Sequence, residues 1–253
     1  QVDAFTGQVF HGNPAAVCPL ESWLDDETMR AIAAENNLSE TAFFVREGEG
    51  YALRWFTPKA EVDLCGHATL ASAFVILEIL DPTRQQVAFS TKSGTLTVTR
   101  EGPRLVMNFP SRPGESATAS EALLRGLGRE PQAVFRSRDY LVLYDSEATV
   151  RALVPDMAAL MEVDRLGVIV TAPGEQVDFV SRCFAPRLGV PEDPVTGSAH
   201  CTLIPYWSKR LGKAEMIAWQ VSERGGELFC TDLGERVKVA GQAVLYMQGT
   251  IRL

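Results

Sequence analysis

The chain has 253 residues and a formal net charge of −8, with 46% hydrophobic and 22% charged residues. This balance is typical of a globular protein with a large core. The acidic charge excludes the basic patch that nucleic acid or an anionic membrane surface requires, so we expect neither as a partner. The five cysteines show no CxxC spacing, which favours free thiols in a reducing cytoplasm. No signal peptide is visible in the sequence, so we expect a cytoplasmic protein. The sequence opens on Gln1 and not on Met, so we expect a few native residues before Gln1.

The first half is predicted to be rich in strands. Strand-like runs are expected at 2–6, 15–20, 41–47, 51–57 and 61–64, with an amphipathic helix from Asp25 to about Asn37. The longest apolar run, 68–80, is interrupted only by Glu78 and is too short to cross a bilayer, so it predicts a buried helix. An alternating meander follows and ends near Pro110.

The second half repeats this order of elements. The polar segment 111–119 is predicted to be a linker. Strands are expected at 134–138, 140–145, 166–172 and 177–185, helices at 146–162 and 198–211, and four further strands up to the C-terminus.

The repeat predicts an α+β fold with two pseudo-symmetric lobes, each a mostly antiparallel sheet or barrel wrapped around a central helix. We expect an N-terminal lobe at 1–112 and a C-terminal lobe at 113–240. The final strand, 241–253, is expected to return to the N-terminal lobe. Both apolar helices would then direct their N-termini toward a common cleft.

Gly66 and Gly197 each stand at the start of one apolar helix. The first N–H groups of a helix have no intrahelical partner and attract anions. For Gly66 or Gly197 taken alone, a role as an ordinary glycine at a helix start is a sufficient explanation. Two such starts facing one cleft predict a site that binds a carboxylate or stabilises an enolate-like charge.

His67 is the most promising of the three histidines. It lies in the first turn of a predicted helix, beside Asp63, where the charged imidazolium is disfavoured. A neutral ring there can donate or accept a proton. Ordinary solvated or core positions explain His11 and His200 as well or better.

Two other kinds of site are not supported by the spacing. One is a zinc site formed by Cys65, His67, His200 and Cys201. The spacings C-x-H and H-C are not those of zinc sites, and adjacent side chains on a helix point in different directions. Ser198 lacks the strand–GxSxG–helix context of an acyl-transfer nucleophile. We therefore expect no metal and no hydrolase nucleophile.

For three more residues, the sequence alone leaves a chemical and an ordinary role open. Cys65 is either a thiolate base activated by the helix start or a small buried apolar residue. Glu40 is either an acid/base beside the apolar strand that follows it or an exposed capping residue. Asp193, before Pro194, is most simply a turn former.

Four stretches of the sequence together resemble a known family. They are VDAFTGQVFHGNPAAVC, NLSETAFF, FTPKAEVDLCGHATLA and EDPVTGSAHCTLIPYW. In this order and spacing they are similar to the PhzF-like phenazine-biosynthesis family, whose fold is that of diaminopimelate epimerase. The resemblance is spread over most of the chain, and EDPVTGSA is highly specific.

The resemblance implies a metal-free and cofactor-free isomerase with its active site in the cleft between two similar lobes. In the phenazine enzyme, the glutamate of the SET motif moves a proton between two carbons of a dihydro-hydroxyanthranilate, and Glu40 stands at that position. His67 in the GHAT motif, and Asp193 and Ser198 in DPxTGS, match residues that hold the substrate's amine and carboxylate and assist proton transfer. Members are commonly dimers, so a homodimer is expected.

Cys65 departs from the phenazine enzyme, which lacks a thiol before the Gly-His pair. In the related epimerases, a cysteine at this helix start is one of two catalytic bases. The second helix has Thr196 where the other cysteine would stand, so the two-thiol arrangement is incomplete. The resemblance therefore leaves the substrate open.

Residues and resemblance together predict a cofactor-independent isomerase that moves a proton on a small, amino-substituted carboxylate. Acid/base catalysis is assigned to Glu40, His67 and Asp193, and substrate binding to Cys65, Gly66, Gly197 and Ser198. One alternative is an amino-acid-type epimerase or racemase that uses Cys65. Another is a non-catalytic carboxylate-binding protein of the same fold.

Overall fold

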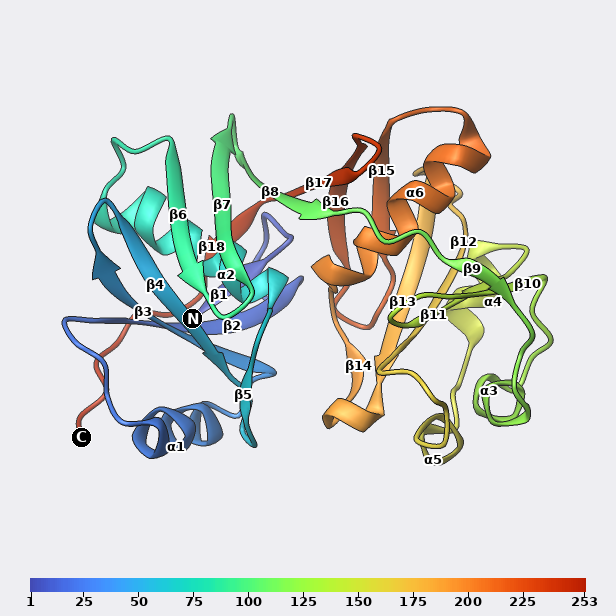
Figure 1. The fold of residues 1–253 in the computed structure, drawn as a ribbon, viewed down its shortest axis with the longest axis horizontal. Helices are drawn as coiled ribbons and strands as arrows, with labels where there is room; N and C mark the ends of the chain where they lie inside the picture. Colours follow the sequence, from blue (N-terminus) through green and yellow to red (C-terminus); the bar gives the residue numbers. More distant parts are fainter. The chain divides into compact units, whose positions relative to one another are not determined.

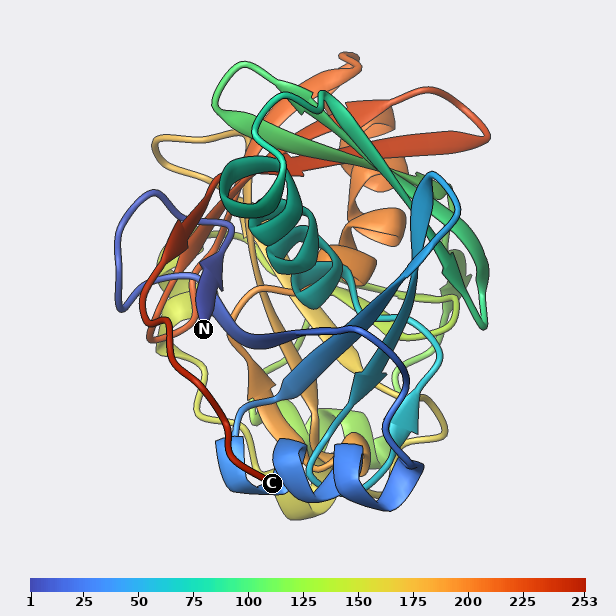
Figure 2. The same cartoon turned by 90° about the vertical axis from the view of Figure 1, so that its left-hand side faces the viewer.

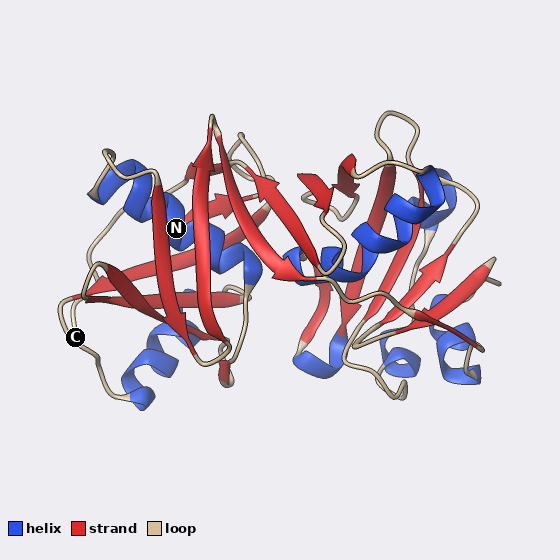
Figure 3. Cartoon of the chain, turned by 45° about the horizontal axis from the view of Figure 1, so that its top comes forward, coloured by secondary structure: helices blue, strands red, loops and turns tan.

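The computed structural model describes all 253 residues, which divide into two compact units. One unit comprises Gln1–Asn108 with Ala240–Leu253, and the other comprises Phe109–Val239. The chain crosses the boundary between them in β8 (Arg104–Pro110) and in β17 (Arg236–Gly241) (Figure 1). Strands dominate both units, with few helices, which confirms the predicted α+β class (Figure 3). None of the helices is both long enough and apolar enough to cross a membrane.

The first unit surrounds one buried helix with strands. Besides the start of β8 and the end of β17, its elements are β1 (Val2–Ala4), β2 (Asn13–Leu20), α1 (Asp26–Asn36), β3 (Glu40–Glu47), β4 (Gly50–Phe56), β5 (Glu61–Val62), α2 (Gly66–Phe74), a π-helix (Val75–Leu80), β6 (Gln86–Thr91), β7 (Gly94–Glu101) and β18 (Ala243–Leu245). Helix α2 contacts β1, β2, β3 and β18, and Figure 2 shows it in the middle of this unit's strands.

Helix α2 is buried from Gly66 to Ala73, and strands of this unit pack against it. Such a helix tolerates polar residues only where they are hydrogen-bonded. Thr69 Oγ1 donates to the carbonyl of Cys65, and Ser72 Oγ donates to the carbonyl of Ala68. Both hydroxyls are thereby satisfied within the helix.

The two faces of strand β3 serve different neighbours. Phe43 packs with Met29 and Ile32 of α1. Because side chains alternate along a strand, Glu40 and the other even-numbered residues lie on the opposite face, the side on which α2 packs. The parallel register pairs Glu40 with Ala15 of β2, which places the beginning of β2 beside that of β3.

The second unit is a sheet covered by helices on both faces. Besides the end of β8 and most of β17, it contains β9 (Glu115–Ala117), α3 (Glu121–Leu127), β10 (Ala133–Arg136), β11 (Tyr140–Leu143), α4 (Glu147–Ala152), α5 (Met157–Leu160), β12 (Val168–Pro173), β13 (Phe179–Ala185), a 3₁₀ turn (Pro186–Leu188), β14 (Val190–Asp193), a second 3₁₀ turn (Gly197–Ala199), α6 (His200–Leu211), β15 (Glu215–Gln220) and β16 (Gly226–Asp232).

Alternation along β13 gives each face of this sheet its own core. Val180 packs into a cluster with Leu123 of α3 and Leu160 of α5. Phe179 points the other way and stacks on Trp207 of α6, with ring centroids 5.5 Å apart. Trp207 also donates from Nε1 to the hydroxyl of Thr171 on β12, at 3.0 Å. One apolar layer and one specific polar contact therefore fix α6 on its sheet.

A proline within α6 is accommodated by a partner outside the helix. Pro205 has no N–H, so the carbonyl of Cys201, four residues earlier, has no intrahelical donor. The backbone N–H of Arg112 donates to this carbonyl instead, at 2.8 Å. The segment after β8 therefore supplies a backbone contact to α6.

Three sequence-based expectations differ from the structure. The helix predicted at 146–162 is two helices, α4 and α5, because Pro155 interrupts it and Asp156 caps the second. The linker predicted at 111–119 contains β9, which pairs with β10. Helix α3, which has a capping Ser120 and Glu121 in its first turn, was not expected.

Candidate active site

Glu40, Cys65 and His67 gather in the first unit. Glu40 is the first residue of β3, Cys65 is the N-cap of α2, and His67 lies in the first turn of that helix. Glu40 Oε2 lies 3.3 Å from His67 Nε2, and Cys65 Sγ lies 3.5 Å from His67 Nδ1. The ring therefore has the carboxylate at one nitrogen and the thiol at the other.

With its amide oriented as in this structure, Asn13 assigns the proton of the neutral His67 ring to Nε2. Its Nδ2 lies 3.1 Å from His67 Nδ1. An amide NH₂ can only donate, so Nδ1 accepts, and a neutral ring must carry its hydrogen on Nε2. That hydrogen faces Glu40 Oε2. The Nε2 side of His67 therefore faces one of the two carboxylate oxygens, at 3.3 Å.

The backbone before Asn13 is shaped by a glycine. Gly12 has a φ of 65°, in the left-handed region, and a Cβ at this position would collide with the carbonyl oxygen of Ala4. Glycine is the residue that adopts this conformation without steric cost. The turn lets β2 begin with the fully buried Asn13 directed at His67.

Burial keeps the His67 ring neutral. The side chain is 4% exposed, and desolvation lowers the pKa of His67 from 6.5 to about 3. The expected neutral imidazole is therefore present, but its main cause is burial and not the helix terminus. Glu40 Oε2 is itself buried, so the 16% exposure of this side chain belongs to its other atoms.

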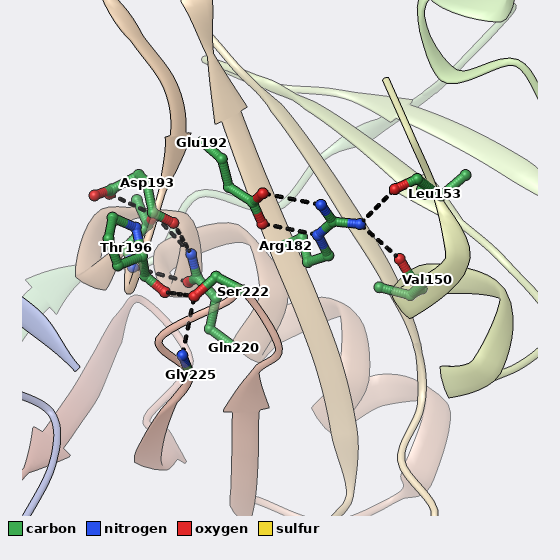
Figure 4. A network of polar contacts seen from close by, with 10 residues as sticks. Val150, Leu153, Arg182, Glu192, Asp193, Thr196, Gln220, Ser222 and Gly225 are labelled. Carbon is green, nitrogen blue, oxygen red and sulfur yellow. Dashed lines mark hydrogen bonds and ion pairs between the residues drawn. The ribbon is translucent and has the colours of Figure 1, made fainter. Parts of the chain in front are cut away.

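In the second unit, Gln220 holds the loop that follows β14 (Figure 4). Its Oε1 accepts from the N–H of Thr196 at 2.8 Å, and its Nε2 donates to the carbonyl of Asp193 at 2.7 Å. Thr196 Oγ1 donates to Asp193 Oδ2 at 2.6 Å. Ser222 Oγ donates to the carbonyl of Pro194 at 2.7 Å. Side chains from outside the loop thus fix the DPVTGS stretch on both sides of Val195.

A second set of contacts in Figure 4 anchors β14 itself. Arg182 forms a two-pronged ion pair with Glu192, at 2.7 and 2.9 Å. Its remaining nitrogen donates to the carbonyls of Val150 and Leu153 at the end of α4. Paired guanidinium–carboxylate contacts restrict orientation as well as distance. The residue before Asp193 is therefore tied to both β13 and α4.

Comparison with known proteins identifies the family. The model of the phenazine biosynthesis-like protein family, PhzC-PhzF, matches residues 2–249. The chain belongs to this family. It is 54% and 56% identical to two uncharacterized isomerases of Pseudomonas aeruginosa, covering 100% of this chain in both cases and 98% and 97% of those proteins.

A solved structure extends this kinship to three dimensions. A PhzF-family phenazine biosynthesis protein of Enterococcus faecalis is 48% identical, with a TM-score of 0.97, and the match covers 100% of this chain and 97% of that one. The resemblance predicted from the four motifs is thereby confirmed, and so is the fold class that it implied.

The remaining predicted site residues of this PhzF-like chain lie at helix starts. Gly66 is buried at the first position of α2, and no side chain caps that end. Gly197 is buried and Ser198 is half-buried, in a 3₁₀ turn that precedes α6. The second apolar helix therefore begins with a tighter turn than expected.

Asn13 and Gln220 are the site residues that the sequence did not single out. Asn13 lies within a motif that carried the resemblance, between a glycine and a proline at the start of a strand. A polar residue that begins a buried strand needs a partner, and this was a usable signal. Gln220 had no local signal, because its role depends on β15 lying next to β13.

His200 gives a prediction about acid stability. Its Nδ1 donates to the carbonyl of Thr196 at 2.9 Å, and burial lowers the pKa of His200 from 6.5 to about 4. The unfolded chain keeps the ordinary value, so it binds more protons between these two pH values. The free energy of unfolding therefore falls as the pH drops from about 6.5 to about 4.

Replacing His200 with Asn, which retains an N–H donor for Thr196, is expected to remove about 3 kcal/mol of this pH dependence. Urea unfolding at several pH values measures it, and His67 supplies the slope that remains. An unchanged slope between pH 6.5 and 4 would show that His200 takes up no proton on unfolding. Above pH 7, where His200 is neutral in both the folded and the unfolded chain, the stability of the wild-type protein and of the variant should depend on pH in the same way.

Proposed function

We propose that this PhzF-like chain moves a proton between two carbons of a small, amino-substituted carboxylate, with Glu40 as the shuttling group. Its relatives at 54% and 56% identity are named isomerases, and the chain is an isomerase on that basis. The observation that carries the proposed mechanism is the 3.3 Å contact between Glu40 Oε2 and the neutral ring of His67.

This contact suits a group that must both accept and return a proton. The ring of His67 lies against Oε2, and we assign the proton transfer to the other oxygen of the carboxylate. The oxygen takes a proton from one carbon and delivers it to another. Because the neutral imidazole donates without a full positive charge, it does not fix the carboxylate permanently in its ionised form.

Removing a proton from carbon also requires stabilisation of the anion that remains. We assign this role and the holding of the substrate's amine and carboxylate to Asp193, Ser198 and the N–H groups after Gly66 and Gly197. The support is the family resemblance at these positions, together with the fixed geometry that Gln220 gives to the DPVTGS stretch. A fixed donor costs no reorganisation during the reaction.

The test is hydrogen exchange with solvent. The purified protein is incubated in D₂O with a dihydro-hydroxyanthranilate and with a panel of small amino carboxylates, and proton NMR follows each carbon-bound hydrogen. The proposal predicts that deuterium enters at least one compound, at a carbon conjugated or adjacent to the carboxylate. A compound that binds tightly, with no exchange in any bound ligand, would favour a non-catalytic carboxylate-binding protein.

The second candidate is an epimerase that uses Cys65 as a base. The contact between Cys65 Sγ and His67 Nδ1, at 3.5 Å, favours it, since it places the thiol beside a polar group at the start of α2. Our primary proposal predicts that Cys65→Ser lowers the exchange rate less than tenfold, because the hydroxyl keeps the size of the side chain and the shuttle is Glu40. A near-total loss would favour the epimerase. Cys201→Ser, which alters a buried thiol in α6, is the matched control.

A further inference from the structure

Glu40, Cys65 and His67 bring together three side chains that bind soft divalent cations. A carboxylate oxygen, a thiol sulfur and an imidazole nitrogen lie within 4.8 Å of one another. We propose that these three residues form a binding site for Zn²⁺ or a similar cation, which blocks the isomerase when it binds. Binding stands on geometry alone, whereas the block rests on the proposed function.

One pair of ligand atoms already has the separation that tetrahedral zinc coordination requires. Zinc bond lengths of about 2.0–2.3 Å place two ligands about 3.4 Å apart when both are nitrogen or oxygen, and about 3.6 Å apart when one is sulfur. His67 Nε2 lies 3.3 Å from Glu40 Oε2 and 4.0 Å from Cys65 Sγ. The first pair already has the required separation. Cys65 Sγ lies nearer to Nδ1, at 3.5 Å, so its side chain must turn toward the Nε2 side to bind the same cation.

Asn13 supplies the support that a metal-bound histidine needs. Such a ring usually donates its other N–H to an oxygen, which fixes its orientation. With the metal on Nε2, the ring proton moves to Nδ1. The amide of Asn13, 3.1 Å away, can turn to present Oδ1 and accept it. The same residue thus serves the ring in either tautomer.

The charges and protons of this binding step balance. The Cys65 thiol loses its proton to solvent, the His67 ring stays neutral, and the Glu40 carboxylate is already anionic when it binds the metal. Two negative ligands then compensate the two positive charges of the cation. Cys65 and His67 are buried and Glu40 is partly exposed, so entry is possible on the Glu40 side. Water completes the coordination.

Local spacing could not predict this site. Cys65 and His67 are separated by one residue, which is not a zinc spacing, and Glu40 lies far earlier in the chain. The third ligand arrives because β3 packs against α2. A carboxylate of Glu40 that binds a cation cannot take up the substrate's proton. The metal-bound form is therefore inactive in our proposal.

Cadmium titration tests the binding directly. Cd²⁺ is added to the metal-stripped full chain, and the ultraviolet absorption of the cadmium–thiolate bond is followed. We expect saturation at one equivalent, displacement by Zn²⁺, and loss of the band in Cys65→Ser. His67→Asn and Glu40→Gln should each weaken Cd²⁺ binding at least tenfold. Cys18→Ser, at the half-buried thiol of β2, should keep the band.

Loss of the band in Cys18→Ser, or a band that survives in Cys65→Ser, would overturn the proposal. So would unchanged affinity in both Glu40→Gln and His67→Asn, since two of the three ligands would then play no part. The exchange assay adds a separate readout: buffered Zn²⁺ should stop deuterium incorporation, and a chelator should restore it. If no exchange occurs even without metal, the proposed function fails, while the titration still decides the metal site.

Discussion

Glu40→Gln is expected to lower turnover about 10³-fold while substrate binding changes little. The amide has nearly the same shape and can still face the Nε2 of His67, but it cannot take up and return a proton. General acid/base groups contribute about 10²–10⁴-fold, so losing one that acts at both carbons should fall within this range. A 10³-fold loss corresponds to about 4 kcal/mol of transition-state stabilisation.

Steady-state kinetics and calorimetric binding measure the two parts of this prediction. Glu47→Gln is the matched control, because Glu47 is the exposed last residue of the same strand, β3. It should keep wild-type turnover and binding. If Glu40→Gln lost binding and turnover to the same extent, Glu40 would be a substrate-binding residue and not the shuttle.

His67→Asn is expected to lower turnover by about 10²-fold. The shorter side chain gives up the 3.3 Å contact with Glu40 Oε2, so the carboxylate loses its neighbour on that side. Since burial keeps the pKa of His67 near 3, the ring is neutral throughout the working range. The pH profile of turnover above pH 5 should therefore keep its wild-type shape in this variant.

The double variant distinguishes positioning from an independent contribution. If His67 acts through Glu40, then Glu40→Gln/His67→Asn should be no slower than Glu40→Gln alone, because the residue it positions has already lost its function. If the loss of turnover in the double variant equals the product of the two single losses, His67 has its own role at the substrate. Circular dichroism and thermal unfolding check that the buried substitution leaves the fold intact.

In the first unit, the motifs of the sequence pointed to Glu40 more specifically than its local context did. Context alone allowed Glu40 to be an exposed capping residue, and only the SET motif supported an acid/base role. The structure places Glu40 on the face of β3 that packs against α2. Phe43 packs against α1, so Glu40 lies on the opposite face of β3. The packing of α1 on β3 cannot be seen in the local sequence.

The contacts of Asn13 and Gln220, which were not predicted, depend on segments that are distant in the sequence. Asn13 meets His67 because β2 packs against α2. Gln220 meets the DPVTGS stretch because β15 runs beside β13. In contrast, the break at Pro155 and the cap at Ser120 were readable locally, and a stricter use of proline and capping rules would have found α4, α5 and α3.

Comparing solvent exchange in Glu40→Gln and Cys65→Ser tests the central claim most directly. Each variant is incubated in D₂O with the compound that the wild-type protein exchanges, and NMR measures deuterium at the reacting carbon. We predict no incorporation with Glu40→Gln and at least a tenth of the wild-type rate with Cys65→Ser. Undiminished exchange in Glu40→Gln, with loss of exchange in Cys65→Ser, would contradict the role of Glu40 as the shuttle. It would show that the thiol of Cys65 transfers the proton.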